Sequence, residues 1–391
     1  MSDNGPRPDN AVLLLDHSAE LGGGELSLFD YVRSTATNVK VVVFEQGPFV
    51  DLLKRFGIAV EVLDAGAVLG VRRGNGIAKI LSIAPSLTRS IVTLSRAMRR
   101  APVVYANSQK ALVVASLANA IVRRPLIWHL HDIMTAAHFS ATMRRIAIGL
   151  SNRFATHVIV NSQATARSYL EAGGRLPFTM IHNGIDPAPF AGIDRATARK
   201  ALVDDAGIPA SVPIVAVFGR LSSWKGQDVA INAISSMPEV HLVLVGAALF
   251  GDTGFETALH EQVRDRGLAD RIHFLGFRND IARLMSAVDI IVHASTAPEP
   301  FGRVIAEAMM AGTPVIASAA GGALEIVEDG VSGLLVPPGD PAALTVAIKR
   351  LVADPQQTTM IAQTAHTVVQ ARFSLASAVA RTDAVIGSLK P

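Results

Sequence analysis

Two glutamates eight positions apart, Glu299 and Glu307, stand in the stretch "EPFGRVIAEAMMAG". A proline at a first helical position, followed by good helix formers, predicts a helix from near Pro300 to Gly312. Most of this helix is apolar, so Glu307 would be a carboxylate on a largely buried surface. An unpaired buried charge is too costly to keep. Glu307 is therefore either partnered within the protein or at a cleft edge, or it accepts hydrogen bonds from the hydroxyl groups of a ligand.

Two basic residues flank a serine-rich turn in "GRLSSWKG", residues 219–226. The turn directly follows a predicted strand, so Arg220 and Lys225 lie at the carboxyl end of that strand. An arginine fork and a lysine point charge can together neutralise a diphosphate. The alternative is that both side chains only pair with surface acids.

Glycines precede two predicted helices. Gly22, Gly23 and Gly24 in "GGGE" allow positive φ angles and close backbone approach, and the N–H groups at the start of the following helix can hold an anion. The pattern is neither the dinucleotide-binding fingerprint nor a Walker A loop, and a plain tight turn would also explain it. At the second helix, the N–H groups of Phe301 and Gly302 could bind a phosphate or sugar oxygen.

Two histidines in "WHLHDI", His129 and His131, alternate on a predicted strand and so share one face. A zinc site would need a third ligand, for which His138 and Asp132 are the nearest candidates. Otherwise one histidine is a satisfied core residue and the other points into a cleft.

Short β-branched runs alternate with helical stretches along the whole chain, which predicts two doubly wound parallel sheets of the α/β class. Two such domains are expected to face each other across a cleft, with ligands at the carboxyl ends of the strands. We expect an N-terminal domain over residues 1–190, a C-terminal domain over 191–372 and a final helix, 373–391, that packs back on the first domain. The predicted strands are 11–15, 40–44, 58–62, 103–107, 126–130 and 157–161, then 213–219, 241–246, 272–276, 289–295, 314–318 and 333–338.

Composition excludes several classes of protein. The 391 residues are 50% hydrophobic and 18% charged, as in a globular protein with large cores, and without cysteine there is no disulfide framework. No secretory signal is visible, and the longest apolar stretch, 111–122, is too short to span a bilayer. Residues 65–170 contain 14 basic residues and one acid, Asp132, which predicts a surface that meets phosphate or an anionic membrane.

These motifs together resemble one enzyme family. The chain is similar to the retaining nucleotide-sugar glycosyltransferases of family 4, which have the GT-B fold. The stretches that carry this similarity are "EPFGRVIAEAMMAGTPVIAS" and then "GGALEIVEDGVSGLLVPPGD", preceded by "FGRLSSWKG" and "HNGID". The similarity runs from about Gly22 to Asp340 and is strongest in the second half. It implies transfer of a sugar from a UDP- or GDP-linked donor to a glycan or lipid-linked acceptor.

The resemblance also implies roles for single residues. Glu307 would hold the ribose hydroxyls of the donor and Glu299 the hydroxyls of its sugar. Arg220 and Lys225 match the pair that stabilises the departing diphosphate, and His131 fits a position that lines the donor–acceptor site. The other donor-binding residues implied are Gly22, Gly23 and Gly24, in a loop that approaches phosphate or acceptor, and Gly219, Arg278 in the base-reading segment 275–280, Phe301, Gly302 and Arg303.

The expected chemistry is electrostatic stabilisation of a leaving diphosphate, without a metal or other cofactor. No Asp-x-Asp occurs in the chain, the element with which the other large class of glycosyltransferases holds a cation. Two rivals remain: a sugar-nucleotide epimerase of the same architecture, and a non-catalytic two-domain sugar-binding protein, which should carry an export signal.

A basic helix predicts where the enzyme works. From Pro85, a helix would place Leu87, Ile91, Leu94 and Met98 on one stripe and Arg89, Arg96 and Arg100 opposite, with Arg99 nearby. Arginines that are merely solvated are the alternative. With the basic pairs in 71–74, at 123–124 and at 144–145, this helix favours a cytoplasmic enzyme at the inner membrane face and a polyprenyl-diphosphate-linked acceptor of exopolysaccharide or envelope glycan assembly. Nucleic acid is not an expected partner.

Overall fold

The computed structural model describes residues 11–63, 77–136, 139–248 and 253–390. By its internal contacts the chain divides into two compact units. Unit 1 holds residues 1–184 and 375–391, and unit 2 holds residues 185–374. The sequence placed the first boundary after residue 190 and began the final segment at 373.

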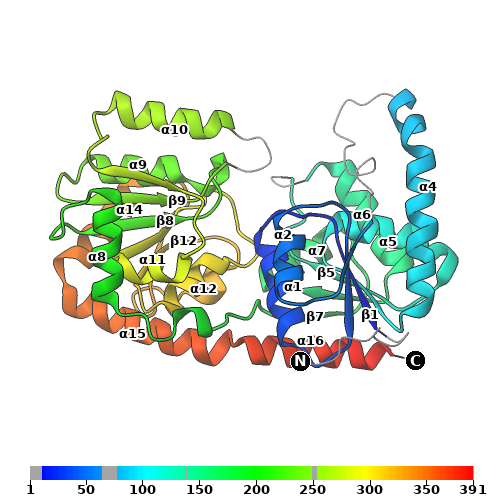
Figure 1. Ribbon diagram of the computed structural model, residues 1–391. Coiled ribbons are helices and arrows are strands. Elements are labelled where there is room, and N and C mark those ends of the chain that lie inside the picture. Colours follow the sequence, from blue (N-terminus) through cyan, green and yellow to red (C-terminus); the bar gives the residue numbers. More distant parts are fainter. Residues whose placement is uncertain (1–10, 64–76, 137–138, 249–252, 391) are drawn as a thin grey trace. The chain divides into compact units, whose positions relative to one another are not determined.

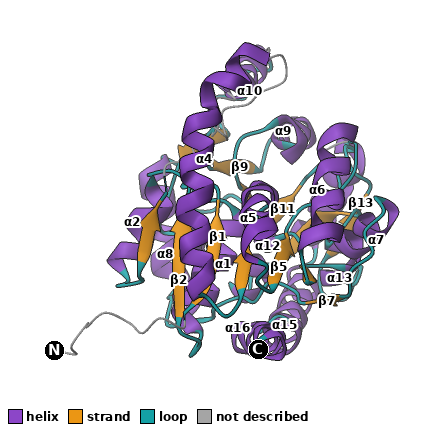
Figure 2. Cartoon of the chain, turned by 90° about the vertical axis from the view of Figure 1, so that its right-hand side faces the viewer, coloured by secondary structure: helices purple, strands orange, loops and turns teal. Residues whose placement is uncertain are grey.

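Unit 1 is a seven-stranded parallel sheet in the order β3-β2-β1-β4-β5-β6-β7. Figure 2 shows its strands side by side with helices packed over the sheet. Its strands are β1 (Val12–Asp16), β2 (Val39–Val43), β3 (Val60–Val62), β4 (Val104–Ala106), β5 (Leu126–Leu130), β6 (His157–Val160) and β7 (Phe178–Met180). Its helices are α1 (Gly23–Ser34), α2 (Pro48–Arg55), α4 (Ile77–Arg100), α5 (Gln109–Val122), α6 (Ala141–Phe154), α7 (Gln163–Glu171) and α16 (Leu375–Leu389).

Unit 2 is a six-stranded parallel sheet in the order β10-β9-β8-β11-β12-β13. Its strands are β8 (Ile214–Phe218), β9 (His241–Val245), β10 (Ile272–Gly276), β11 (Ile290–His293), β12 (Val315–Ser318) and β13 (Leu334–Val336). Its α-helices are α8 (Arg195–Ala206), α9 (Gln227–Ser235), α10 (Thr253–Asp265), α11 (Ile281–Ala287), α12 (Arg303–Met310), α13 (Ala323–Ile326), α14 (Pro341–Ala353) and α15 (Pro355–Arg372), with 3₁₀ turns η1 (Ala188–Phe190) and η2 (Ser223–Lys225). Figure 1 shows both sheets coloured along the chain.

Both sheets are buried on both faces, which explains why their strands are continuous apolar runs. In β1, Leu13 and Leu15 belong to one core cluster and Val12 and Leu14 to another, and all four are at most 2% exposed. Unit 2 likewise has one cluster on each face of its sheet. The fold is therefore the predicted pair of parallel-sheet α/β domains, and the twelve predicted strands are confirmed.

Two helices differ from their predicted bounds. The helix predicted from Pro300 starts at Arg303, because Gly302 has φ 96°, which lies outside the helical region, and it ends at Met310. The helix predicted from Pro85 starts at Ile77, so the proline lies inside α4 rather than at its beginning. On α4, Leu94 and Met98 are buried while Arg89, Arg96, Arg99 and Arg100 are exposed, as the predicted stripe requires. Residues 71–74 lie outside the described ranges.

The C-terminal helix α16 packs against α1 within unit 1, as Figure 1 shows. Asp383 is the polar centre of this contact. Its carboxylate accepts hydrogen bonds from the hydroxyl groups of Tyr31 at 2.7 Å, Thr35 at 2.8 Å and Thr37 at 2.8 Å. Hydrogen bonds to a charged group are stronger than those between neutral groups.

Replacing Asp383 with alanine should lower the free energy of unfolding of unit 1 by about 2–4 kcal/mol, because three hydroxyl groups lose a charged acceptor. Urea unfolding followed by the fluorescence of Trp128 measures this, with Trp224 of unit 2 changed to phenylalanine in every variant. Ser388→Ala is the matched control, since Ser388 is exposed on the same helix. Equal midpoints for Asp383→Ala and Ser388→Ala would contradict the prediction.

The described helices include none with both the length and the apolar character that a bilayer-spanning segment requires.

Candidate active site

Glu299 is a buried charged residue that follows β11 of unit 2. Its side chain is 9% exposed, and its Oε1 atom pairs with the Nζ of Lys225. The same oxygen lies 3.0 Å from Nε2 of His293 and accepts a hydrogen bond from the Ser295 hydroxyl at 2.6 Å. Burial alone would raise the pKa of the Glu299 carboxyl, but Lys225 and His293 outweigh it and hold that pKa well below its usual range. Glu299 is therefore an ionised carboxylate beside a lysine.

The loop that carries Lys225 is held against the segment that carries Glu299. The Thr296 N–H donates to the Trp224 carbonyl at 2.8 Å. Gly226 follows at φ 70°, and a Cβ atom there would lie 2.0 Å from the Ala294 carbonyl oxygen. Glycine at 226 thus permits the close approach that brings Lys225, after β8, to Glu299, after β11.

A turn made by Gly321 and Gly322 also contacts the backbone of Glu299. The Gly322 N–H donates to the Glu299 carbonyl at 2.8 Å. A Cβ atom on Gly321, at φ 61°, would lie 2.2 Å from the same oxygen, and one on Gly322 would lie 2.4 Å from the Phe301 carbonyl oxygen. The backbone from 299 to 301 is therefore packed directly on this turn.

Glu307 lies on α12 and is partnered within the helix. Nε of Arg303, one turn earlier, donates to its Oε1 at 2.6 Å, and each side chain is 16% exposed. A charged pair of this kind satisfies a half-buried carboxylate without a ligand. The binding of ribose by Glu307 remains a prediction.

The remaining predicted residues of unit 2 also follow strand ends. Gly219 has φ 138° and directly follows β8, and Arg220 is next, half-buried, with its carbonyl accepting from Nε2 of Gln227 at 3.0 Å. Arg278, after β10, pairs with Asp280 at 2.8 Å and Asp205 at 2.7 Å, and these hydrogen bonds raise its pKa. Arg278 therefore connects its loop to α8, which carries Asp205, whereas Lys225 pairs with Glu299.

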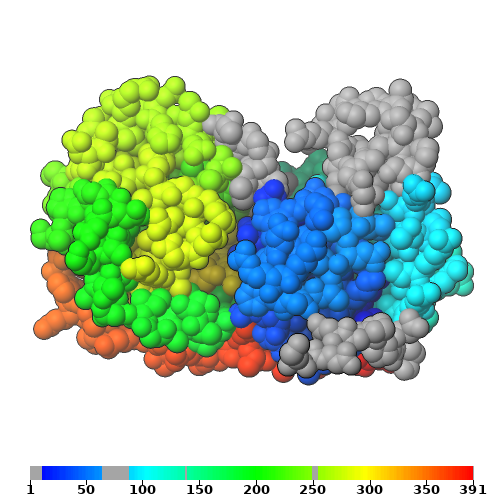
Figure 3. Space-filling model, in the orientation of Figure 1, coloured from blue at the N-terminus to red at the C-terminus, as the bar shows by residue number. Residues whose placement is uncertain are grey.

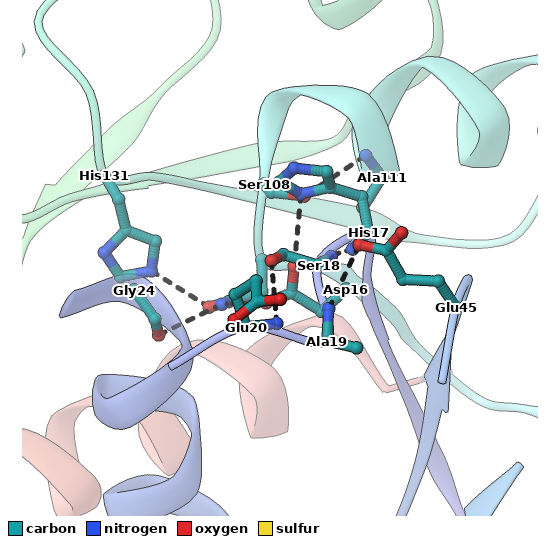
Figure 4. A network of polar contacts seen from close by, with 11 residues as sticks. Asp16, His17, Ser18, Ala19, Glu20, Gly24, Glu45, Ser108, Ala111 and His131 are labelled. Carbon is teal, nitrogen blue, oxygen red and sulfur yellow. Dashed lines mark hydrogen bonds and ion pairs between the residues drawn. The ribbon is translucent and has the colours of Figure 1, made fainter. Parts of the chain in front are cut away.

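In unit 1 a polar network joins three neighbouring strands at their carboxyl ends (Figure 4). Asp16 ends β1 and is fully buried. Nδ2 of Asn107, which follows β4, donates to Asp16 Oδ2 at 2.6 Å and to the Gly24 carbonyl at 3.2 Å. Oδ1 of Asn107 lies 2.9 Å from Nε2 of His131, which follows β5.

His131 is held as a neutral ring. Burial lowers its pKa to about 4, although the nearby Asp16 acts in the opposite direction. Its ring lies 3.8 Å from that of His129, whose Nδ1 bonds to the Tyr105 hydroxyl. Each of the two histidines has one ring nitrogen with a partner and one without, but among the described residues no third ligand is grouped with them, Asp132 included, and His138 lies outside the described residues. The alternative of a zinc site at these histidines is therefore not supported.

The glycine loop ends at a helix whose third residue is Glu25. Gly22 is the N-cap of α1, and Glu25 stands in the first turn. Burial, and next the charge of Asp16, raise the pKa of Glu25 to about 8. Among the described residues, Asp16, His17 and Glu25 form a group of possible metal ligands. One oxygen or nitrogen atom of each lies within 4.8 Å of those of the other two. A cation would require Glu25 to lose its proton.

Several residues of these networks were not predicted. His293 and Ser295 stand inside the predicted strand 289–295, and Asp16 and Asn107 end buried strands. The available signal was the position: a polar residue that ends an apolar parallel strand lies at the edge where ligands bind. Gly321 and Gly322 were quoted as part of a motif without a role.

The chain matches known families over both halves. The model described as "Glycosyltransferase Family 4" matches residues 21–189, and that described as "Glycosyl transferases group 1" matches residues 199–368. HepE of Anabaena, solved with UDP and glucose, is 40% identical with a TM-score of 0.88, and the match covers 97% of this chain and 100% of HepE.

Two curated relatives match over shorter stretches. The lipopolysaccharide core biosynthesis glycosyltransferase LpsE of Rhizobium meliloti is 32% identical over 217 residues, 56% of this chain and 60% of LpsE. A D-inositol 3-phosphate glycosyltransferase of Mycolicibacterium gilvum is 35% identical over 206 residues, 51% of this chain and 46% of the relative. The chain thus spans about half the length of these curated relatives. Since the match to HepE covers nearly all of both chains and the family models match both halves, the chain belongs to the family 4 glycosyltransferases of the GT-B fold.

Proposed function

We propose that this protein is a retaining glycosyltransferase that moves a hexose from a UDP- or GDP-linked donor to a glycan or lipid-linked acceptor. The observation that carries the proposal is the pair of Lys225 with the buried Glu299 at the carboxyl edge of a parallel sheet. This places a cation suited to a diphosphate beside a carboxylate suited to sugar hydroxyls. HepE, which has also been solved with UDP-glucose, supports the choice of donor.

In this reaction the bond between the anomeric carbon and the diphosphate breaks, a bond from that carbon to a hydroxyl oxygen of the acceptor forms, and the hydroxyl proton passes to the departing diphosphate. Negative charge grows on the leaving diphosphate, and Lys225, together with Arg220, stabilises it. Glu299, ionised by its neighbours, accepts hydrogen bonds from the hydroxyls of the sugar. Glu307 exchanges part of its pairing with Arg303 for the ribose hydroxyls. Unit 1 supplies His131 and the loop of Gly22 to Gly24 for the acceptor.

This function is tested by measuring how fast the protein turns over each of a panel of nucleotide sugars, with and without EDTA. We expect hydrolysis or transfer with a UDP- or GDP-sugar, at a rate that EDTA does not change, because the charge on the diphosphate is met by Lys225 and Arg220. An activity lost in EDTA and restored by manganese would contradict the metal-free mechanism. Epimerised donor without release of nucleotide would contradict the transfer reaction itself.

We further propose that the acceptor belongs to exopolysaccharide or envelope glycan assembly and is carried on a polyprenyl diphosphate at the inner membrane face. LpsE is named for lipopolysaccharide core biosynthesis, which supports an envelope acceptor. On unit 1, Arg89, Arg96, Arg99 and Arg100 are exposed on α4, beside Val92, which is 41% exposed. Figure 3 shows this part of α4, in cyan, on the surface. Exposed arginines beside an apolar side chain suit an anionic bilayer.

The protein should sediment with vesicles rich in anionic lipid and not with neutral vesicles. Each basic residue near an anionic surface contributes about 1 kcal/mol, so Arg96→Glu together with Arg100→Glu should weaken binding at least about tenfold. The matched control reverses two exposed charges of unit 2, Lys349→Glu with Arg350→Glu, and should bind like the parent. If anionic vesicles are ignored at low salt, or both double variants behave alike, a soluble acceptor becomes the better proposal.

A further inference from the structure

His293 is a buried polar residue at the carboxyl end of β11. The three residues before it in the strand are apolar and at most 1% exposed, and the side chain of His293 is 5% exposed. Among the described residues its ring makes polar contacts only with Glu299 and Ser295. Its Nδ1 atom is buried and has no hydrogen-bond partner there. Because an unpaired buried polar atom destabilises a fold, the ring of His293 is explained by its contact with Glu299 and not by the core.

Nε2 of His293 donates a hydrogen bond to Glu299. It lies 3.0 Å from Oε1 of Glu299. The Glu299 carboxyl is ionised, and an ionised carboxylate can only accept hydrogen bonds, so Nε2 must carry a proton. This is true of the neutral ring with its proton on Nε2, and also of the imidazolium, which carries a second proton on Nδ1. His293 therefore holds Glu299 in either charge state of the ring.

The hydrogen bonds and ion pairs that the described residues make with the Glu299 side chain all meet on Oε1. The donors are Nζ of Lys225, the Ser295 hydroxyl at 2.6 Å and Nε2 of His293 at 3.0 Å. A carboxylate has about four lone-pair sites on its two oxygens, so three donors saturate Oε1. Oε2 has none of these contacts and is not one of the buried side-chain atoms without a partner, so it is open to solvent. A ligand that bonds to Glu299 must therefore use Oε2.

The three donors differ in how firmly they hold Oε1. A lysine side chain is flexible and presents a point charge, and a serine hydroxyl can rotate. The imidazole of His293 is rigid and stands on a strand inside the sheet, between β8 and β12. Groups on strands position a site more precisely than groups on loops. His293 is therefore the donor best placed to fix the direction in which Oε2 points.

Lys225 cannot be the sole partner of Glu299 in the proposed reaction. Its Nζ pairs with Glu299, and the proposed function also requires it to stabilise the departing diphosphate. Each N–H group that turns to the diphosphate is lost to Glu299, which is buried and needs partners for its charge. His293 and Ser295 can stay on Oε1 when Lys225 turns. Their presence thus allows one lysine to contact both groups.

We propose that His293 is a positioning residue of sugar transfer, which holds Oε1 of Glu299 so that Oε2 accepts a hydrogen bond from a hydroxyl group of the donor sugar. The inference rests on the proposed roles of Glu299 and Lys225. His293 acts through Glu299 and touches neither the sugar nor the nucleotide. Its loss should therefore affect transfer from a nucleotide sugar and leave the binding of the free nucleotide unchanged.

Steady-state kinetics of the full chain tests this, with the nucleotide sugar that wild type turns over fastest, and calorimetry measures the affinity for UDP and GDP. His293→Phe keeps a flat ring and removes the donor, and His293→Gln keeps an N–H donor at the end of its side chain. The matched control is His241→Phe. His241 begins β9 of the same sheet, is 7% exposed and pairs with His273 at 3.0 Å, so its replacement also removes a buried hydrogen bond.

His293→Phe should lower kcat/KM at least about tenfold and keep the affinity for UDP or GDP within about twofold of wild type, because the lost hydrogen bond acts only on the sugar contact. His293→Gln should have a kcat/KM at least about threefold above that of His293→Phe. His241→Phe should match wild type in both quantities. A wild-type kcat/KM in His293→Phe would overturn the proposal. So would an equal loss of free-nucleotide affinity, an equal loss of kcat/KM in His241→Phe, or no recovery in His293→Gln.

A second measurement separates this inference from the proposed function. In protein labelled with δ-¹³C glutamate, the signal that is missing from Glu299→Gln identifies Glu299. At neutral pH this signal should shift in His293→Phe, return toward its wild-type position in His293→Gln and stay unchanged in His241→Phe. If wild type turns over no nucleotide sugar, the proposed function fails, and the signal still shows whether His293 holds Glu299. A Glu299 signal that His293→Phe leaves in place would overturn the inference whatever the activity.

Discussion

Replacing Lys225 with methionine should reduce the turnover of the nucleotide-sugar donor by about 10²–10³-fold, the usual effect of removing one group that stabilises charge in a transition state. The Nζ of Lys225 is the cation that pairs with Glu299, and its side chain is 18% exposed, so it is poorly screened by water. Steady-state kinetics with a saturating donor measures the loss, which should appear in kcat.

The same substitution should also destabilise unit 2, because it leaves the Glu299 carboxylate buried without its lysine. Breaking a buried pair by removing one partner costs about 3–5 kcal/mol. Lys225→Met combined with Glu299→Gln removes both charges and should recover most of that stability without recovering turnover. Lys200→Met, at a pair 77% and 61% exposed, is the control and should change neither quantity. A Lys225→Met protein with normal kcat, or a double variant that regains activity with stability, would contradict the assigned role.

Replacing Glu307 with alanine should weaken the binding of UDP or GDP by about 10- to 100-fold, since hydrogen bonds to a charged group are worth about 1.5–3 kcal/mol each. In the proposed site this carboxylate, which pairs with Arg303, also accepts hydrogen bonds from the ribose hydroxyls. Isothermal titration calorimetry measures the dissociation constant, and kcat at saturating donor should change less than the affinity.

The matched control for Glu307 is Glu261→Ala, an exposed glutamate on α10 of the same unit. Both variants remove one carboxylate from a helix and so change the net charge equally. A difference between their nucleotide affinities is therefore due to the position of Glu307. If Glu307→Ala and Glu261→Ala bind the nucleotide equally well, Glu307 serves only as the partner of Arg303, the first of the two readings that the sequence left open.

The fold could be predicted because its strands are buried on both faces. A parallel strand such as β8, with all five residues apolar and buried, leaves an unbroken apolar run that few other structures produce. The strand that was missed, β7, is short and lies at the edge of its sheet, and none of its residues is buried. Its sequence therefore carries no such run. The predicted start of α4 was wrong because Pro85 was taken as the first residue of the helix. Tertiary packing can also tolerate a proline inside a helix.

For the candidate site, the sequence singled out residues but did not predict their contacts. Lys225 was singled out for its place after a strand and Glu299 from its motif, but they are 74 positions apart, and their pairing depends on which strands are neighbours. β8 and β11 are adjacent in the sheet, a consequence of its winding order that no local pattern reveals. The same holds for Asp16 and Asn107, 91 positions apart, whose strands β1 and β4 are also adjacent.

The most direct test of the central claim is the anomeric configuration of the first product, whether the sugar is released or transferred. ¹H NMR measures this configuration before mutarotation changes it. A retaining glycosyltransferase that uses Lys225 and Glu299 as described should convert an α-linked UDP- or GDP-sugar into the α-anomer of the product. The signal should disappear in Lys225→Met. A first product of inverted configuration would contradict the retaining mechanism, and the absence of any product from every nucleotide sugar would contradict the proposed function.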